Sequence, residues 1–476
     1  MPRHMSLFAG HRRSQQVVER AERHPWWILA ALVLVVLVFG AGKLWIDPPS
    51  TEFNLQNRWW QIALNVEHGR GYTACKPEYF PFCGPENQQT AMREPLPVLV
   101  YAGIAWLTTD SLMAAAAFGV ALNAATLVCL FFLGRELHRT VTGLIAAFIW
   151  ALYLPPVRLY YDQVSGDLFA TFAITLALFL VVRAQRTCAW THWAFAGVCF
   201  GIAILSRSAT IVVVAALAMG FAVMTRRRQS SMQQRGRRLS HIGIFALACA
   251  LTMSPWVVRN TIVFDQPVVG STLSGYYLYR QHHMLASDDY LRFVTGGEFE
   301  AVIADMVERR DGLTGTENEA EMDAIYREEA LTAIRHEPFR YVALSMYRGL
   351  MLWFNWDVKS AYSQRNSALD LVMMAQQLVL KVAGIVGVWK LGRRAWPLVV
   401  SVIAFSLIYM AVQAHLAYII PVMPLVVALV AVAVTARRHG APMVKSDTTS
   451  SCAASPASQK DRKNEDTHIE TQFGRL

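Results

Sequence analysis

Long apolar segments recur along most of the chain, separated by polar loops. Most of them approach the ~20 residues that an α-helix needs to cross the hydrocarbon core of a bilayer. The first, PWWILAALVLVVLVFGAGKLW at 25–45, follows a basic segment, as in a signal peptide. Its apolar run is too long for a signal peptide, and no small-residue cleavage site stands out. We therefore interpret it as an uncleaved first span.

This pattern predicts an all-α multispanning membrane protein with about ten transmembrane helices. Residues 1–24 would be a basic cytoplasmic segment, and residues 25–436 the transmembrane domain. The tail at 437–476 is polar, lacks periodicity and is predicted to be disordered. The predicted spans are 25–46, 112–134, 142–158, 165–184, 192–206, 208–225, 241–258, 368–390, 396–414 and 417–436.

Two long polar segments, at about 47–94 and 259–367, interrupt the series of spans. Within the second, Thr316 and Glu319 have capping-box spacing, and apolar positions follow at helical intervals as far as Pro338. The helix should end there, because proline disfavours helical geometry in the residue before it. The following FRYVALSMYRGLMLWF predicts an interfacial helix. Residues 95–109 are apolar but short, which indicates a re-entrant or interfacial helix.

Composition agrees with a membrane protein, since 54% of the residues are hydrophobic and only 16% are charged. The formal charge of +10 is concentrated in short loops, such as Arg135 with Arg139 and Arg393 with Arg394. With alternating spans, all of these clusters fall on one side, as the positive-inside rule requires. The charge therefore indicates orientation in the plasma (inner) membrane and not nucleic-acid binding. Both termini would be cytoplasmic and both long loops external.

Two of the seven cysteines, Cys75 and Cys83, lie close together in the first external loop. A disulfide between them is expected because the external compartment is oxidising. The alternative is two unpaired small residues. A zinc site would need further ligands, and only Glu78 and His68 are near in the sequence. No metal-ligand cluster is evident, so we expect no cofactor and leave a divalent metal open.

Several short motifs lie in the predicted loops and at the ends of spans. They are WWQIALNVEHGRGY at 59–72, GPENQQTAMREPLPVLVYA at 84–102, GVCFGIAILSRSA at 197–209, SPWVVRNTIVF at 254–264 and AYIIPVMPL at 417–425. In their order and topological positions they resemble the GT-C superfamily of membrane glycosyltransferases. The resemblance is to the family that contains the protein O-mannosyltransferases and the aminoarabinose transferases of lipid A (glycosyltransferase family thirty-nine).

The resemblance implies a GT-C-like bundle that transfers a sugar from a polyprenyl-phosphate donor to an extracytoplasmic acceptor, with inversion at the anomeric carbon. The acceptor could be a lipid, a glycan or a protein. The motifs place several residues at the implied site. Arg93, Arg207 and Arg259 would bind the donor phosphate, and Arg58, Tyr72, His415 and Tyr418 would contact substrate. Alternatively, Arg93 only anchors the chain at the interface or pairs with Glu94.

Transfer to a hydroxyl or amine needs a carboxylate that takes the proton of the acceptor. The family has an acidic residue in the first external loop, where this chain has Leu55 and Gln56. Glu52 is the nearest upstream acid and could substitute for it. A second acid is expected before the fourth span, where both Asp162 and Asp167 are candidates. Asp167 could instead serve as a helix N-terminal charge.

Two other classes of function remain. A non-catalytic relative that binds a polyprenyl lipid or stabilises a partner is favoured by the missing loop acid and by Ala417, where the family has an arginine. A transporter or flippase would place ionisable residues inside the membrane and show internal repeats. Lys381 is the clearest candidate for such a charge.

Overall fold

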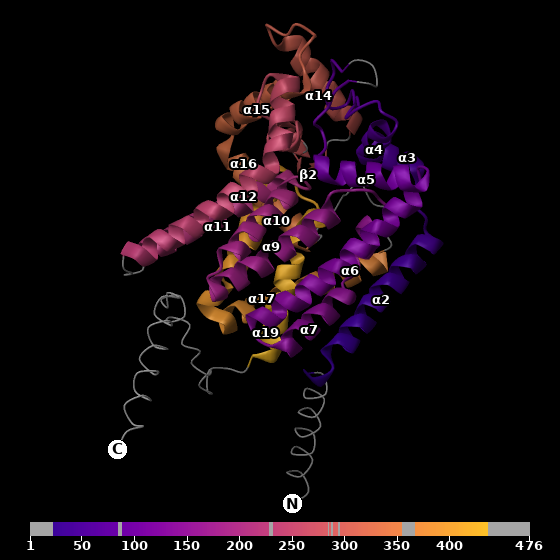
Figure 1. Ribbon diagram of the computed structural model, residues 1–476. Coiled ribbons are helices and arrows are strands. Elements are labelled where there is room, and N and C mark those ends of the chain that lie inside the picture. Colours follow the sequence, from indigo (N-terminus) through magenta and orange to yellow (C-terminus); the bar gives the residue numbers. More distant parts are fainter. Residues whose placement is uncertain are drawn as a thin grey trace, which may run out of the picture.

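The computed structural model describes residues 22–83, 88–227, 232–283, 285–286, 289–293, 296–354 and 367–436. Long helices form a bundle, and shorter helices gather at one end of it (Figure 1). The bundle consists of α2 (Pro25–Ile46), α6 (Leu112–Leu137), α7 (Thr140–Ala151), α8 (Leu154–Tyr160), α9 (Asp167–Thr187), α10 (Trp190–Ile204), α11 (Ile211–Arg227), α12 (Met232–Phe264), α17 (Ser367–Leu391), α18 (Trp396–Val412) and α19 (Met423–Thr435). Three 3₁₀ segments adjoin these helices: η1 (Ser208–Thr210), η2 (Gly392–Ala395) and η3 (Leu416–Val422).

The shorter elements come from the two long loops and from the helix that follows the first loop. We call them the capping layer. They are α3 (Thr51–Gln56), α4 (Trp59–Glu67), α5 (Pro95–Thr108), α13 (Ser274–His283), β1 (Leu285–Ala286), β2 (Asp289–Phe293), α14 (Gly296–Arg309), α15 (Glu319–His336) and α16 (Pro338–Phe354). The antiparallel pair β1–β2 is a small departure from the predicted all-α class.

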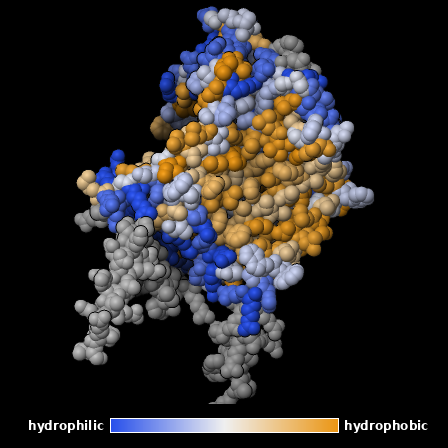
Figure 2. Space-filling model, viewed as in Figure 1, coloured by the Kyte–Doolittle hydropathy of each residue, from blue (hydrophilic) through white to orange (hydrophobic). Residues whose placement is uncertain are grey.

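Eight helical segments in the described residues are long and apolar enough to cross a membrane. Each of the ten predicted spans falls on helix. The number of candidate segments is smaller by two, because two predicted spans lie in one candidate and another predicted span lies on a helix that is too short. Leu371–Val412 is one continuous candidate that includes both predicted spans 368–390 and 396–414. Trp190–Ile204 has only 15 residues. The surface of the bundle is a broad apolar belt between polar ends (Figure 2), as expected for a protein in lipid.

The two long loops do not form separate units, because their aromatic residues pack into one core in the capping layer. Tyr79 from the first loop packs against Tyr276 on α13, and the hydroxyl of Tyr326 on α15 donates to the carbonyl of Tyr79 at 3.0 Å. Gly275 permits a close approach of α13 to α15, since a Cβ there would lie 1.9 Å from the carbonyl oxygen of Asp323. The capping layer is therefore held together from both loops.

Helix α15 shows how a local pattern can be correct in kind and wrong in register. It ends at His336, as Pro338 predicts. Its capping box, however, is formed by Asn318 and Glu321, and not by Thr316 and Glu319. Asn318 accepts the backbone N–H of Glu321, and Glu321 accepts that of Asn318. Glu319 is thereby left for another role, described below.

Candidate functional site

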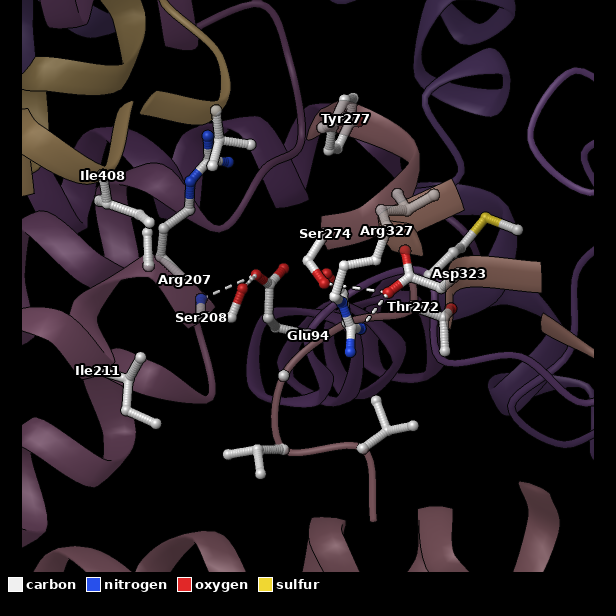
Figure 3. Close-up of a pocket in the computed structure, with 18 of the residues that line it drawn as sticks. Glu94, Arg207, Ser208, Ile211, Thr272, Ser274, Tyr277, Asp323, Arg327 and Ile408 are labelled. Carbon is white, nitrogen blue, oxygen red and sulfur yellow. Dashed lines mark hydrogen bonds and ion pairs between the residues drawn. The ribbon is translucent and has the colours of Figure 1, made fainter. Parts of the chain in front are cut away.

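A cavity of about 570 Å³ lies between the bundle and the capping layer (Figure 3). One wall comes from the ends of α18 and η3, from the loop after α10 and from the segment before α5. The other comes from α13 and α15. The polar and aromatic side chains that line it are Arg93, Glu94, Arg207, Ser208, Thr272, Ser274, Tyr277, Asp323, Arg327, Tyr409, Gln413 and Tyr418. Arg93, Arg207 and Tyr418 among the predicted site residues are thus brought together.

Arg207 is the most constrained charged residue of the cavity. Its Nη1 lies 3.3 Å from Oδ2 of Asp167, the first residue of α9, and both side chains are largely buried. Its Nε donates to the hydroxyl of Tyr409 at 2.7 Å, and its guanidinium lies 4.7 Å from the ring centre of Tyr418. A buried ion pair with such support holds the guanidinium in one orientation toward the cavity. Oδ1 of Asp167 is buried without a hydrogen-bond partner.

Next to this ion pair, the backbone at Gly166 lies very close to the backbone at Ser206. A Cβ on this residue would lie 2.1 Å from the carbonyl oxygen of Ser206 and 2.9 Å from the Trp59 side chain. Only glycine allows the start of α9, the residue before Arg207 and α4 to meet so closely. Gly166 therefore sets the distance across which Asp167 and Arg207 pair.

Glu94 is a second carboxylate at the cavity, and only 6% of it is exposed. It is the N-cap residue of α5. Its Oε1 accepts both the backbone N–H and the hydroxyl of Ser208, each at 2.9 Å. These two bonds fix the carboxylate against Ser208 (Figure 3), and its Oε2 takes part in neither. From the sequence, Glu94 is expected only as a possible partner for Arg93, and its position at the cavity is not predicted.

Arg93 turns away from its neighbour Glu94. Its Nε and Nη2 donate to the carbonyl oxygen of Asn57 at 2.9 and 2.7 Å. Its guanidinium also lies 5.6 Å from the ring centre of Trp59. The hydroxyl of Tyr72 donates to the Arg93 carbonyl at 2.8 Å. The side chain thus connects the start of α5 to the first loop. It also lines the cavity.

On the opposite wall, Asp323 is buried and holds the start of α13. It accepts from the Ser274 hydroxyl at 3.0 Å and from the backbone N–H groups of Gly275 and Tyr276 at 2.6 and 3.2 Å. Arg327 pairs with it at 2.9 Å from the next turn of α15. These contacts form a polar wall facing Arg207 and Glu94 (Figure 3).

Arg259 and Tyr72 lie behind the cavity and hold the first loop in place. Arg259 donates through Nη1 to the carbonyl of Thr90 at 2.8 Å and through Nη2 to that of Tyr72 at 3.4 Å. Its guanidinium also lies over the rings of Tyr72 and Trp256. Neither Arg259 nor Tyr72 is among the cavity-lining residues.

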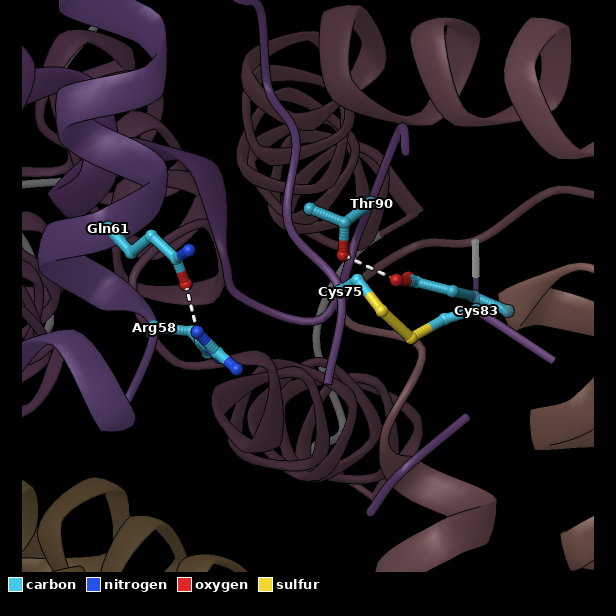
Figure 4. Close-up of a disulfide and its surroundings, with 6 residues drawn as sticks. Arg58, Gln61, Cys75, Cys83 and Thr90 are labelled. Atoms are coloured by element: carbon cyan, nitrogen blue, oxygen red, sulfur yellow. Dashed lines mark hydrogen bonds between the residues drawn. A yellow bond between two sulfur atoms is a disulfide. The ribbon is translucent and has the colours of Figure 1, made fainter. Parts of the chain in front are cut away.

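Asp167 is not among the lining residues either, and it reaches the cavity only through Arg207. Four further predicted site residues lie outside the cavity. Glu52 is exposed on α3 and accepts from Gln56 within the same helix. Asp162 lies 3.7 Å from Nζ of Lys43. Arg58 bonds Gln61 (Figure 4), and His415 caps η3 by accepting the N–H of Ala417 at 3.2 Å.

The segment where the family resemblance implies a loop acid instead contains two structural asparagines. Asn54 is fully buried, and its Oδ1 accepts the N–H of Val164 at 2.7 Å while its Nδ2 donates to the carbonyl of Asp162 at 3.1 Å. Asn57 donates to the carbonyl of Val164 at 3.4 Å and offers its own carbonyl to Arg93. These bonds anchor the first loop to the segment that leads into Asp167.

Cys75 and Cys83 form a disulfide in the first loop, with their Cα atoms 5.7 Å apart (Figure 4). The bond closes a short loop next to Tyr79. Removing it should lower the free energy of unfolding by about 2–3 kcal/mol, the chain-entropy cost of a loop of this length. We expect Cys75→Ser, Cys83→Ser and the double variant to lower the thermal midpoint in detergent equally, because all three remove the same bond. Additive losses would contradict this expectation.

Glu319 joins the two loops beside the cavity. Its carboxylate is buried and accepts from the hydroxyls of Thr90 and Thr272 at 2.6 and 2.8 Å and from the N–H of Ala91 at 2.9 Å. Burial raises its pKa to about 7, although these three donors act in the opposite direction. The carboxyl group therefore changes its protonation state at a higher pH than an ordinary glutamate does.

This pKa predicts a pH-dependent contribution to stability. Because the folded state holds the proton more tightly than the unfolded chain, the contribution is complete below about pH 4.5. It is lost as the pH rises through 7. The difference in free energy of unfolding between wild type and Glu319→Gln should change by about 3 kcal/mol over that window. Thermal midpoints at four pH values would measure it, with the exposed Glu308→Gln on α14 as control. Parallel curves for wild type and Glu319→Gln would contradict the prediction.

One group of three potential metal ligands occurs in the described residues: Glu67, His68 and Asp110. It lies at the ends of α4 and α5, and none of its members lines the cavity. The cavity itself offers a fixed guanidinium, a fixed carboxylate and a polar opposite wall. This combination suits the binding of an anion next to a group that accepts a proton.

The fold and this cavity define an integral membrane protein with the GT-C fold of membrane glycosyltransferases. Residues 93–256, about a third of the chain, match the family model of dolichyl-phosphate-mannose-protein mannosyltransferases. The matched segment begins at Arg93 and contains Glu94, Asp167 and Arg207. A comparison of the sequence with curated proteins gave no match.

Solved structures show the same fold. The oligosaccharyltransferase AglB from Archaeoglobus fulgidus, in complex with an inhibitory peptide and a dolichol-phosphate, matches with a TM-score of 0.50 and 14% identity over 86% of this chain. Its apo form matches with a TM-score of 0.51 and 15% identity, also over 86%. The chain spans about half of that protein, 50% and 51% in the two structures. ArnT from Cupriavidus metallidurans bound to undecaprenyl phosphate gives 0.41 and 14% identity, over 86% of this chain and 78% of its own. The fold comparison therefore rests on AglB.

Proposed function

We propose that the protein is a glycosyltransferase that moves a sugar from a polyprenyl-phosphate donor to an extracytoplasmic acceptor. The observation that carries the proposal is the buried Arg207–Asp167 pair, which holds a guanidinium at a cavity that the Glu94 carboxylate also lines. Further support comes from the match to a family of dolichyl-phosphate-mannose transferases and from the dolichol-phosphate in a structure with the same fold.

Arg207 would bind the donor phosphate. A guanidinium that is already oriented loses little freedom on binding, and a charge-assisted bond in a water-poor cavity is stronger than in bulk water. As the bond between sugar and phosphate breaks, negative charge grows on the leaving phosphate, and Arg207 stabilises it. Arg93 adds positive charge on the same side. Asp167 acts as a positioning residue through Arg207.

Glu94 would be the general base. Its Oε2 takes the proton from the acceptor hydroxyl or amine while the acceptor atom bonds to the anomeric carbon. The bond between that carbon and the donor phosphate breaks, and its electron pair stays on the phosphate. A single displacement of this kind inverts the anomeric configuration. Glu52 and Asp162 take no part in this mechanism.

The topology proposed for the reaction follows from the distribution of charge. Basic clusters lie in loops opposite the capping layer, such as Arg183 and Arg186 at the end of α9. The positive-inside rule then places the termini in the cytoplasm and the cavity at the external face. A donor whose phosphate lies at the external headgroup level could enter the cavity from the bilayer.

The test is mass spectrometry of polyprenyl-phosphate sugars in cells with and without the gene. Accumulation of one lipid-linked sugar in its absence is the expected result, and this would also identify the donor sugar. If the lipid pool and the surface glycans do not change, the transferase proposal is wrong.

A second candidate function is a non-catalytic protein that binds a polyprenyl lipid. It is favoured by Leu55 and Gln56 in place of the loop acid and by Ala417 in place of an arginine. Under this alternative, substitution of Glu94 leaves glycan output unchanged. A transport function has less support, because the buried Nζ of Lys381 faces the rings of Trp353 and Phe354 at 4.9 and 5.2 Å and is isolated from the cavity.

A further inference from the structure

We propose that Glu67, His68 and Asp110 form a binding site for a divalent cation of the zinc class, separate from the cavity. Glu67 is the last residue of α4, His68 is its C-cap, and Asp110 lies between α5 and α6. One ligand atom from each residue lies within 4.8 Å of the other two. None of the three takes part in the proposed transfer reaction.

The spacing of the ligand atoms matches that around zinc. Nε2 of His68 lies 3.2 Å from Oε2 of Glu67 and 3.4 Å from Oδ2 of Asp110. Ligands about 2.1 Å from a tetrahedral zinc ion are about 3.4 Å from one another. Both distances from Nε2 fit this spacing, and His68 and Asp110 are 44% and 41% exposed, so that a further ligand position can open to solvent.

The histidine tautomer supports this assignment. Nδ1 of His68 is 2.8 Å from the carbonyl oxygen of Leu64, and this contact requires Nδ1 to carry the proton. Nε2, on the other side of the ring, then lies toward the two carboxylate oxygens. A hydrogen bond from Nδ1–H to a backbone carbonyl commonly orients a zinc-ligating histidine.

One carboxylate oxygen of the group also lacks a hydrogen-bond partner among the described residues. The distances to His68 are short, yet Oε2 of Glu67 is buried without a hydrogen-bond partner. Two helices, α4 and α5, end at this point, and their C-terminal ends add partial negative charge. Arg70 is the nearby cation, with Nη2 3.4 Å from Nδ1 on the other side of the ring. A divalent ion between the three ligand atoms would neutralise this concentration of negative charge.

His and carboxylate ligands at this spacing favour zinc over calcium or magnesium, which prefer six or more oxygen ligands. A bound ion would fasten the C-terminal end of α4 to the α5–α6 junction. It would thereby fix the two helices that flank the disulfide loop. Its role is structural, and donor binding at the cavity does not depend on this proposal.

The test is a zinc titration of the full-length, tag-free protein in detergent after removal of metal with a chelator. We expect one equivalent of zinc to bind, and the thermal midpoint to rise. His68→Asn and Asp110→Asn should each weaken this binding at least about 100-fold. His336→Asn, on the exposed end of α15, is the matched control and should bind zinc like the wild type.

Two results would overturn the proposal. In the first, the wild type does not bind zinc, or His68→Asn binds it as well as the wild type does. His68 would then contact the two carboxylates only as an ion-pair partner. The other is stabilisation by calcium or magnesium with no response to zinc. Because Asp110 has a positive φ, comparison of the circular dichroism of both variants with the wild type separates loss of the ligand from loss of the fold.

Discussion

Glu94→Gln is expected to lower the rate of sugar transfer about 10²–10⁴-fold, the usual contribution of a general base. The amide keeps the size of the side chain, and its oxygen can still accept both bonds from Ser208. The fold and donor binding should therefore persist while proton removal is lost. A purified protein assayed with a polyprenyl-phosphate sugar would show a lower kcat with a nearly unchanged KM for the donor.

Glu52→Gln provides the matched comparison for this prediction. Glu52 is exposed on α3 and contacts only its own helix, so that its loss should leave transfer unchanged. If Glu52→Gln abolishes transfer and Glu94→Gln does not, the loop acid acts as the base despite its place outside the cavity. The mechanism proposed for Glu94 would then be wrong.

Arg207→Gln is expected to have the second large effect, on both activity and stability. It removes the proposed phosphate ligand, and it leaves the Asp167 carboxylate buried without a counter-charge. Loss of one partner of a buried pair costs about 3–5 kcal/mol. The variant should therefore show no transfer and a clearly lower thermal midpoint.

The double variant Arg207→Gln/Asp167→Asn separates these two effects. It removes both charges, so that most of the lost stability should return, while transfer stays absent because the phosphate ligand is still missing. Thermal midpoints and donor binding measured on the three proteins provide the check. Recovery of transfer in the double variant would show that Arg207 serves the fold and does not bind the donor phosphate.

The sequence predicts the membrane fold well, because lipid imposes a strong and local constraint. Each span needs a continuous apolar run, and such runs are visible in the pattern alone. The same reasoning predicts that Arg207 is unusual, as an arginine on the side opposite the basic loops. It also identifies Asp167 at a helix start. That the two residues pair depends on the contact at Gly166, which joins segments distant in the sequence.

Glu94 and Glu319 show why the remaining parts of the site could not be predicted. Glu94 adjoins Arg93, so that a local interpretation pairs them, but at the start of α5 the two side chains diverge toward Ser208 and Asn57. Glu319 has capping-box spacing from Thr316, yet it contacts Thr90 in the other loop. Both cases depend on tertiary packing between loops. Such contacts leave no periodic pattern of apolar and polar residues in the sequence.

The central claim is that this protein catalyses sugar transfer at the cavity beside Arg207. The most direct measurement is the pool of polyprenyl-phosphate sugars in cells that lack the gene and are supplied with either wild type or Glu94→Gln at equal expression. We expect the wild type to return the accumulated lipid to its normal level, whereas Glu94→Gln leaves it accumulated. Equal restoration by both proteins would contradict catalysis by Glu94 at this cavity and favour a lipid-binding role.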